Sequence, residues 1–449
     1  MLFYTLPYLA VFLPFSLILF FSSKYLKIDN KIILIFLSLF FYSWWNIYYL
    51  PVILISIIFN YFISKKIISE IKKKKFFLFL GIFLNILLLG IFKYFDFIIE
   101  NINFIFSLNI NLLNLPFPLA ISFFTFQSIT FLINSYDEEI INLKAKDFFL
   151  FIVFFPQLVA GPIVKYNHMM PQFKNENNWV FNKRNFSIGL IVLFIGFVKK
   201  VYFADTLSTF VDTNYENLDK IDTYLAWLVS LCFTFQFYFD FSGYVDMATG
   251  SAIMMNIYLP QNFNSPYKST SIINFWQRWH ITLTHFLTNY IYSPILRSFK
   301  NINFFNSMVS ILAVFLIAGL WHGPSWTFVI FGAFHGVGLI INHSFKNYVN
   351  YKIPNLVSWF ITFNFVNISF VFFRSETMAD ALLIIKKMFN LNLLGSYDLN
   401  FSINGLFFLF LNNFNLIICF LLSIVICFYF KNTYELLRDK DNKYLTKEK

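Results

Sequence analysis

Long apolar stretches separated by short polar segments dominate the chain from its first residues to residue 430. A helix that crosses a bilayer needs about 20 apolar residues, and several stretches reach or approach that length. We therefore predict roughly ten to twelve membrane helices, the shorter ones being tilted, interfacial or re-entrant. The stretches are residues 6–21, 32–48, 52–63, 76–92, 118–133, 148–159, 186–198, 224–238, 308–320, 326–341, 356–373 and 406–430.

Composition supports this interpretation. Hydrophobic residues make up 58% of the chain and charged residues 13%, and the mean hydropathy is +0.64. Such a chain cannot form a water-facing globule without exposing large apolar patches. We expect an all-α, polytopic membrane protein. No repeat of fixed period and no Pro-rich or Gly/Ser-rich linker divides the sequence, so residues 1–449 are expected to form a single membrane domain.

The distribution of lysine predicts the orientation. Lysines follow the first and third apolar stretches, whereas residues 46–51, between the second and third, carry neither Lys nor Arg. The positive-inside rule then places the N-terminus outside and the short basic tail, residues 431–449, in the cytoplasm. Such loops account for most of the net charge of +11, so nucleic-acid binding is not expected. The first stretch lacks the basic segment and cleavage site of a signal peptide, and we interpret it as a retained span.

The three cysteines give no sign of a disulfide or a metal site. Cys232, Cys419 and Cys427 lie in apolar stretches, without C-x-x-C spacing or neighbouring histidine ligands. The 67 phenylalanines are interpreted as compositional bias at lipid-facing positions and not as ligand-stacking residues.

Polar segments interrupt the apolar pattern, and the first two predict helix packing and a helix break. Residues 118–127 carry hydroxyl and amide side chains, for which hydrogen bonding between helices is the expected use. Residues 154–163 contain Pro156 and Pro162 beside Gln157, so a continuous helix is improbable. A broken or re-entrant helix is predicted there, with its freed backbone groups facing protein or water.

The third polar segment, residues 239–248, holds two carboxylates. Asp240 and Asp246 flank Gly243, and paired carboxylates can serve acid/base chemistry or a metal ion. No His-x-x-x-His pattern or further acid stands at ligand spacing, and carboxylates inside membranes commonly pair with arginine. We favour a structural ion pair, with Arg278 as a candidate partner.

The fourth polar segment, residues 259–292, contains Trp276, Arg278, Trp279 and His280. Tryptophan and cationic residues suit a membrane interface, so the simplest interpretation is an amphipathic helix on the cytoplasmic face. That interpretation accounts for the tryptophans but leaves His280 unexplained. A functional role for His280 is the alternative.

His322 is the stronger candidate for chemistry. It ends the apolar stretch 308–320 and precedes Gly323 and Pro324, which we expect to stop the helix and to open backbone space for a small substrate. A neutral imidazole in that place could take a proton from a hydroxyl. His335, inside the next stretch, is expected to be a hydrogen-bonded packing residue. No role is assigned to His168, His285 and His343.

Six ordered motifs carry a resemblance that covers most of the chain. They are YSWWN at residues 42–46, PLAISFFTFQ at 118–127, FPQLVAGPI at 155–163, DFSGY at 240–244, FWQRWH at 275–280 and WHG at 321–323. In this order and spacing the sequence resembles the membrane-bound O-acyltransferase superfamily, in particular its bacterial alginate and peptidoglycan O-acetylation branch. One departure is Ala120, where relatives usually have glycine.

The resemblance implies a fold and a set of site residues. The family fold is a helical ring around a thinned centre, where a funnel from outside meets a donor entrance from the cytoplasm. The position of His322 is catalytic in such relatives, and that of His280 is a second functional position. We expect substrate or donor contacts, and no metal ligands, from Arg278, Trp279, Trp321, Asp240 and Gln157.

The expected function is transfer of an acetyl group from a cytoplasmic thioester such as acetyl-CoA, with no tightly bound cofactor, to a cell-envelope polysaccharide. Peptidoglycan is the first choice of acceptor, alginate or another exopolysaccharide the second, and D-alanyl transfer to teichoic acid the third. Direct transfer and a relay both stay open. The resemblance also implies a separate periplasmic or extracytoplasmic O-acetyltransferase as partner, and a place among the lipids of the inner, or cytoplasmic, membrane.

A transporter or flippase is the alternative from another class, because buried polar segments could also line a pathway. Transporters often carry inverted repeats with matched broken helices. We find no such repeat in the sequence.

Overall fold

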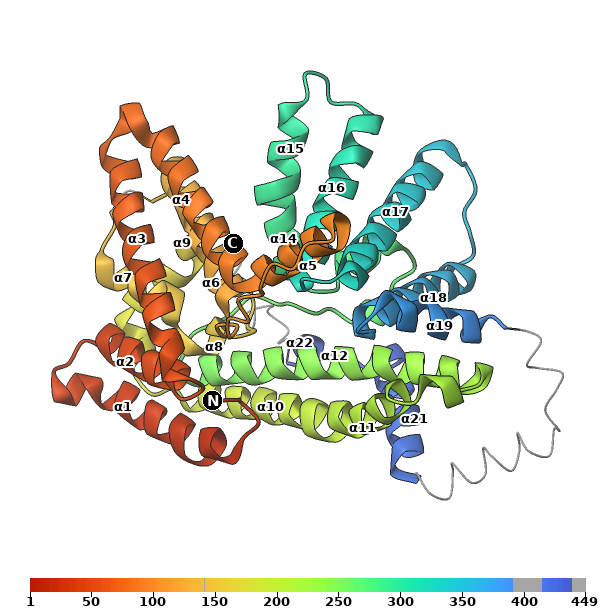
Figure 1. The fold of residues 1–449 in the computed structure, drawn as a ribbon. Coiled ribbons are helices and arrows are strands. Elements are labelled where there is room, and N and C mark those ends of the chain that lie inside the picture. Colours follow the sequence, from red (N-terminus) through yellow and green to blue (C-terminus); the bar gives the residue numbers. More distant parts are fainter. Residues whose placement is uncertain (141, 391–413, 438–449) are drawn as a thin grey trace. The chain divides into compact units, whose positions relative to one another are not determined.

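The computed structural model describes residues 1–140, 142–390 and 414–437, which form helices, turns and loops without any strand (Figure 1). Seven helices in this part of the chain are long and apolar enough to cross a membrane. Shorter apolar helices accompany them at Pro7–Ser23, Asn30–Ser43 and Phe414–Phe428. The all-α, polytopic prediction is therefore confirmed. Residues 406–413 of the last predicted stretch and 438–449 of the basic tail lie outside the described residues.

Contacts group the described residues into two compact units. Unit 1 contains Met1–Phe194, Tyr244–Gln261 and Leu437, and unit 2 contains Ile195–Gly243 and the described part of Asn262–Leu436. The boundaries fall within two helices, Lys183–Val198 and Thr223–Met254, which are named below with the unit that holds most of their residues. The histidines of the predicted site all belong to unit 2.

Unit 1 is built from closely packed helices. The prediction of hydrogen bonds between helices for residues 118–127 is wrong, because the buried side chains of Ser122, Thr125 and Gln127 have no hydrogen-bond partner among the described residues. α6 packs against both α3 and α4, and α7 packs against α2. The helices are η1 (Pro7–Phe12), α1 (Leu13–Leu26), α2 (Asn30–Ser43), η2 (Ile47–Tyr49), α3 (Leu50–Ser69), η3 (Ile71–Lys73), α4 (Lys74–Leu89), η4 (Gly90–Tyr94), α5 (Phe95–Phe106), α6 (Ile121–Tyr136), α7 (Ala145–Val153), α8 (Phe155–Leu158), α9 (Tyr166–Lys174), η5 (Glu176–Trp179) and α10 (Lys183–Val198).

Two buried polar pairs connect these helices. Lys31 on α2 donates to Asp147 on α7 at 2.6 Å, and both side chains are largely removed from solvent. Asn60 on α3 and Asn85 on α4 exchange hydrogen bonds of 3.2 and 2.7 Å. Because lipid offers no hydrogen-bonding partner, such pairs favour one helix arrangement over others.

The predicted helix break at residues 154–163 is confirmed. α7 ends at Val153, Phe154 has ψ 110°, and α8 begins at Phe155 with Pro156 in its first turn. The freed amide of Phe155 donates to the Ser38 hydroxyl at 3.1 Å, so the break faces protein as expected.

Unit 2 contains the α16–α17 hairpin and the short helices that carry the fourth polar segment. α17 also packs against α13 and α18. The helices are η6 (Lys199–Ala204), α11 (Asp205–Tyr215), η7 (Leu218–Lys220), α12 (Thr223–Met254), η8 (Pro266–Lys268), α13 (Ile272–Trp276), α14 (Ile281–Leu287), η9 (Thr288–Tyr292), α15 (Ser293–Ser298), α16 (Phe304–His322), α17 (Trp326–Tyr348), α18 (Asn355–Arg374), α19 (Met378–Met388), α21 (Phe414–Phe428) and α22 (Thr433–Leu436).

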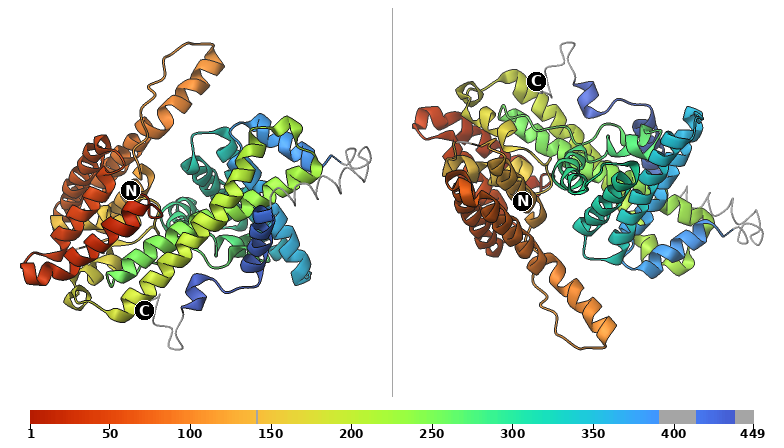
Figure 2. Two further views of the ribbon diagram at one scale, coloured as in Figure 1. Left: turned by 90° about the horizontal axis from the view of Figure 1, so that it is seen from below. Right: turned by 90° about the horizontal axis from the view of Figure 1, so that it is seen from above.

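α12 is longer than predicted. The apolar pattern ends near residue 238, but the helix continues through the third polar segment to Met254, over 32 residues in all. Glycines explain the continuation, because Gly243 brings α12 close to the carbonyl of Gly196, and Gly250 brings it close to that of Gly189. The helix formed by α10 and α11 thus runs alongside α12 within each unit (Figures 1 and 2).

Candidate active site

His280 occupies a strained backbone position between α13 and α14. Its φ of 43° and ψ of 54° lie in the left-handed region, which residues with a Cβ rarely adopt. Two flanking hydrogen bonds hold this geometry: the Ile281 amide donates to the Asn262 carbonyl at 2.9 Å, and the Thr284 amide donates to the His280 carbonyl at 3.0 Å. The surrounding structure, and not local preference, therefore sets the direction of the imidazole.

One side-chain oxygen, Oδ1 of Asn262, accepts three hydrogen bonds. The donors are the Thr282 amide at 3.1 Å, the Thr282 hydroxyl at 2.9 Å and Nδ1 of His280 at 3.1 Å. A backbone amide can only donate, so the Asn262 atom opposite it must be the oxygen and not the nitrogen. Nδ1 of His280 then carries the proton, and the neutral ring has its lone pair at Nε2.

In the described part of the chain, Nε2 of His280 is buried without a hydrogen-bond partner. The residue is 1% exposed, and burial lowers the imidazole pKa from 6.5 to about 3, so the ring is neutral at physiological pH. Its walls are aromatic, since the ring centroids of Phe241 and Trp321 lie 4.8 and 6.2 Å away. An unused lone pair in an apolar enclosure is costly, and it marks a candidate functional atom.

His322 is the last residue of α16, as predicted. Its half-buried ring packs against Phe331 and Phe373, with ring centroids 5.7 and 5.1 Å away. Gly323 does end the helix, but a side chain there would overlap the Phe328 ring. Phe328 therefore fills the space that we expected to be open to substrate.

Trp321 brings the two candidate histidines into one cluster. Its indole lies 4.8 Å from the His322 ring and 6.2 Å from the His280 ring, centroid to centroid. The two motifs that carry these histidines therefore meet within unit 2. We call His280, Trp321 and His322 the histidine cluster.

His335 is the packing residue that the sequence predicts. The Trp276 indole donates to its Nδ1 at 3.2 Å, and its Nε2 lies 2.9 Å from the Ser369 hydroxyl. Because an indole N–H can only donate, Nδ1 of His335 must accept and Nε2 must carry the proton. Both nitrogens are used, in the tautomer opposite to that of His280.

The interpretation of the fourth polar segment as a surface helix is wrong. Trp276 and Trp279 are 4% and 3% exposed, because both indoles pack into unit 2. Trp279 lies against Phe275 and Phe263, which gives it a packing role. Arg278 donates to the Asn274 side chain at 3.0 Å and to the Asn264 carbonyl at 3.2 Å, and these bonds tie the segment together.

Two further predicted contact residues are not part of the histidine cluster. Asp240 is half-exposed and pairs with Lys200 at 2.5 Å. The structural ion pair is thus present, but its partner is Lys200 and not Arg278. Gln157 belongs to unit 1, where it is buried and donates to the Phe151 carbonyl at 2.6 Å.

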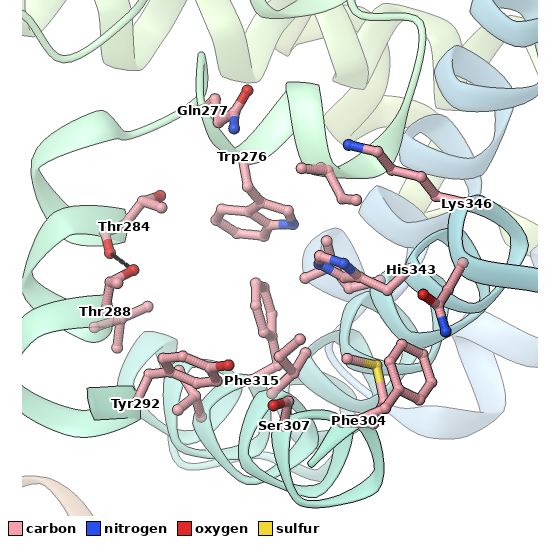
Figure 3. A pocket seen from close by; sticks show the side chains of 17 residues that line it. Trp276, Gln277, Thr284, Thr288, Tyr292, Phe304, Ser307, Phe315, His343 and Lys346 are labelled. Atoms are coloured by element: carbon pink, nitrogen blue, oxygen red, sulfur yellow. Dashed lines mark hydrogen bonds between the residues drawn. The ribbon is translucent and has the colours of Figure 1, made fainter. Parts of the chain in front are cut away.

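Unit 2 also holds a cavity of about 690 Å³, lined by residues of α13, α14, η9, α16 and α17 (Figure 3). Its interior is mostly apolar and includes Trp276 and Phe315. Lys346 and His343 lie on the α17 side, and Thr284 lies across from them on α14. Lys346 supplies a positive charge, and no carboxylate is found among the described residues that line the cavity. Neither histidine of the cluster belongs to its lining.

No group of three His, Cys, Asp or Glu side chains suited to a metal ion occurs among the described residues. The histidine cluster offers imidazoles, which suit proton transfer and hydrogen bonding to a substrate.

Comparison with known proteins identifies the family. Residues 117–375, which include the whole histidine cluster, match the membrane-bound O-acyltransferase family. The chain belongs to that family. Membership answers the transporter alternative in favour of an acyltransferase, and the predicted resemblance is confirmed.

Relatives within the membrane-bound O-acyltransferase family share most of the chain's length. The peptidoglycan O-acetyltransferase of Helicobacter pylori is 41% identical over 426 residues, covering 87% of this chain and 80% of that protein. The probable alginate O-acetylase AlgI of Pseudomonas aeruginosa is 34% identical, covering 87% and 75%. The teichoic acid D-alanyltransferase of Bacillus subtilis is 27% identical, covering 59% and 70%.

Proposed function

We propose that this membrane O-acyltransferase takes an acetyl group from a cytoplasmic thioester and delivers it for O-acetylation of peptidoglycan. The histidine cluster carries the proposal, because it offers imidazole nitrogens for acyl transfer in a chain 41% identical to a peptidoglycan O-acetyltransferase. Alginate-type and teichoic acid acceptors rank lower, in line with 34% and 27% identity to relatives named for them. Acetyl-CoA is the first donor to test.

The reaction needs a base and no tightly bound cofactor. A hydroxyl oxygen attacks the thioester carbonyl carbon, the C–S bond breaks, and the hydroxyl proton ends on the sulfur, which leaves as a thiol. His322 and His280 lie on either side of Trp321 in this cluster, and one of them serves as general base while the other orients the hydroxyl. Arg278, Trp279 and Asp240 hold parts of unit 2 together through the contacts described above. Gln157 makes its contact within unit 1.

The 690 Å³ cavity is the proposed approach of the donor. Residues at the start of α16 and the end of α17 line one side of it. The segments 293–303, before α16, and 344–355, at the end of α17 and beyond it, carry Arg297, Lys300 and Lys352 and contain no acidic residue. The positive-inside rule favours a cytoplasmic location for such loops. Lys346 could there meet a donor phosphate, while the apolar interior accommodates the thioester arm.

A separate extracytoplasmic O-acetyltransferase is the proposed partner that completes modification of the sugar hydroxyl. Affinity purification of this protein from detergent-solubilised inner membranes, followed by mass spectrometry, should recover such a transferase. Its recovery should not depend on His322, because that ring packs within unit 2.

The function is tested by deleting the gene and measuring base-labile acetyl groups on purified peptidoglycan. The wild-type gene should restore them, His322→Ala should not, and His168→Ala, on α9 in unit 1, should restore them as a control. Unchanged peptidoglycan acetylation with loss of acetyl from another envelope glycan would replace the acceptor. Loss from no envelope polymer would overturn the proposed function.

A further inference from the structure

We infer that Asn262 is a positioning residue that holds His280 as the Nδ1–H tautomer, so that Nε2 accepts the hydrogen bond and then the proton of the hydroxyl that is acylated. The identity of that hydroxyl rests on the proposed function. The tautomer rests on hydrogen-bond geometry alone.

The tautomer follows from three bonds that a single oxygen accepts. The Thr282 amide and hydroxyl both donate to Asn262 Oδ1, which fixes the orientation of that amide group. The atom that faces Nδ1 of His280 is therefore an acceptor, and Nδ1 must donate to it. Asn262 is fully buried, so this oxygen is shielded from bulk solvent. The alternative tautomer would place two lone pairs against each other at 3.1 Å, which is unfavourable in an apolar surrounding.

His335 shows that an unused lone pair is not a general property of buried histidines in unit 2. It is as deeply buried as His280, yet Trp276 and Ser369 use both of its nitrogens. At His280, Nε2 is left without a partner among the described residues. A buried polar atom of this kind needs a ligand or a task.

The tautomer restricts what His280 can bind. A thioester carbonyl oxygen only accepts hydrogen bonds, and Nε2 without a proton cannot donate to it. A neutral ring also gives no charge to donor phosphates. A hydroxyl group is the matching partner, because it donates a hydrogen bond and later loses that proton. His280 therefore belongs to the acceptor side of the reaction.

The transfer step balances without any further reagent. As the C–O bond forms, the attacking oxygen becomes oxonium-like and its proton becomes strongly acidic, so a weak base is sufficient to remove it. Nε2 takes that proton. An imidazolium buried against Phe241 and near Trp321 is poorly solvated, so the proton moves on to the sulfur as the C–S bond breaks. His280 returns to its starting state as ester and thiol leave.

The charged and titratable groups near His280 have other partners or positions, so Asn262 is the residue that sets the protonation state of the His280 ring. Asp240, beside Phe241, is paired with Lys200. His322 follows Trp321, and Arg278, two positions before His280, is held by Asn264 and Asn274. Replacing Asn262 with aspartate keeps the acceptor oxygen and adds a negative charge at Nδ1, which favours the protonated ring.

The first experiment measures the pH dependence of acetyl transfer from acetyl-CoA to soluble peptidoglycan fragments by the full-length protein in proteoliposomes, with the co-purified extracytoplasmic partner transferase added. Asn262→Asp should introduce an acid limb that the wild type lacks between about pH 5 and pH 8, because the ring becomes protonated there. Asn262→Leu should lower the rate at every pH by about 10²-fold, since wrong tautomers can cost up to 10⁴-fold in comparable systems. Asn367→Asp, at a buried asparagine that binds Thr234 and Ser230, controls for a buried carboxylate and should not move the profile.

The second experiment separates the tautomer from the function. Solid-state ¹⁵N NMR of histidine-labelled protein in lipid, with His280→Gln for assignment, should show a protonated Nδ1 and an unprotonated Nε2 at His280 from about pH 8 to pH 5. A protonated Nε2, or equal loss of rate by Asn262→Asp at all pH values, would overturn the inference. If the wild type transfers no acetyl while the NMR signature is present, the proposed function fails and the positioning of His280 stands.

Discussion

At the scale of single residues, His280 and His335 show that a buried histidine can be either a candidate reactive residue or a packing residue. Both rings are buried in unit 2, and the difference lies in their partners. Trp276 and Ser369 satisfy His335 completely, whereas Asn262 satisfies one nitrogen of His280 and leaves the other available. A packing residue and a candidate reactive residue are thus distinguished by hydrogen bonding and not by burial.

His280 should make the stability of the protein depend on pH. The unfolded chain binds a proton at this ring near pKa 6.5, but the folded chain does so only near 3. Between these values the unfolded state holds more protons, so the contribution to stability is complete above the upper value and declines as the pH falls toward the lower one. Thermal unfolding in detergent, followed by tryptophan fluorescence at about pH 8 and about pH 5, should show a larger loss for wild type than for His280→Gln. Parallel losses would contradict the buried neutral ring.

His322 should be required for transfer. Replacing it with Ala or Gln removes the base or the group that orients the hydroxyl, and acetyl transfer should fall by about 10²- to 10⁴-fold. The variants should still insert and fold, because the half-buried ring contributes modestly to packing. Near-normal acetyl transfer by well-inserted His322→Gln would remove His322 from the mechanism.

The sequence could identify the reactive side chains but not their supporting partners. His280, Trp321 and His322 stand in motifs, so their importance could be predicted before their proximity was known. Asn262 lies 18 residues before His280 in a loop, and no periodicity links the two positions. The sequence predicts a cationic partner for Asp240, which is correct, but it does not predict that the partner is Lys200. Lys200 lies on another helix, and only the packing of the helices brings it to Asp240.

At the scale of elements, the α16–α17 hairpin positions His322. Gly319, one turn before His322, faces Gly332 on α17, and a side chain at Gly319 would overlap the Phe328 carbonyl. Backbone contact of this kind holds two helices at a fixed separation where larger residues would force them apart. The position of His322 therefore depends on Gly319 having no side chain.

Gly319→Ala should destabilise the hairpin by about 1–3 kcal/mol, because the added methyl overpacks a backbone contact. Acetyl transfer should fall as well, since His322 shifts with the end of α16. Gly90→Ala provides the matched control, because a Cβ there meets nothing within 4 Å. Thermal unfolding and acetyl transfer are measured for both, and equal behaviour of the two variants would show that the hairpin tolerates separation.

Apolar stretches predicted where most helices lie but not where they end. α3 continues through Lys65 and Lys66 to Ser69, and α12 continues through Asp240 to Met254. Ion pairs, glycine contacts and neighbouring helices stabilise these polar extensions. Such contacts join residues that are distant in the sequence, so a hydropathy pattern cannot predict them. The break at Phe154 was predictable because proline acts locally.

At the scale of the whole molecule, the distribution of basic residues predicts which loops face each side of the membrane. Basic residues gather in the loops beside the start of α16 and the end of α17, and the turn between α2 and α3 carries none. The positive-inside rule therefore predicts that the basic loops beside α16 and α17 face the cytoplasm and that the turn between α2 and α3 faces the other side of the membrane.

Cysteine labelling can test this topology. Asn301→Cys should react with a membrane-impermeant maleimide only in inverted membrane vesicles, and Asn46→Cys should react in spheroplasts with intact membranes. The native cysteines Cys232, Cys419 and Cys427 are buried, so background labelling should be low. The reverse pattern would place the N-terminus in the cytoplasm.

The length of α12 ties the enzyme to the thickness of its bilayer. Its 32 residues span about 48 Å, against a hydrocarbon core of about 30 Å, so a helix that lies within the core must tilt by roughly 50°. Lipids with longer or shorter tails change that angle, and Phe241 on this helix forms one wall around His280. Growth temperature and fatty-acid composition, which alter tail length and order, should therefore tune the rate at which the envelope is acetylated.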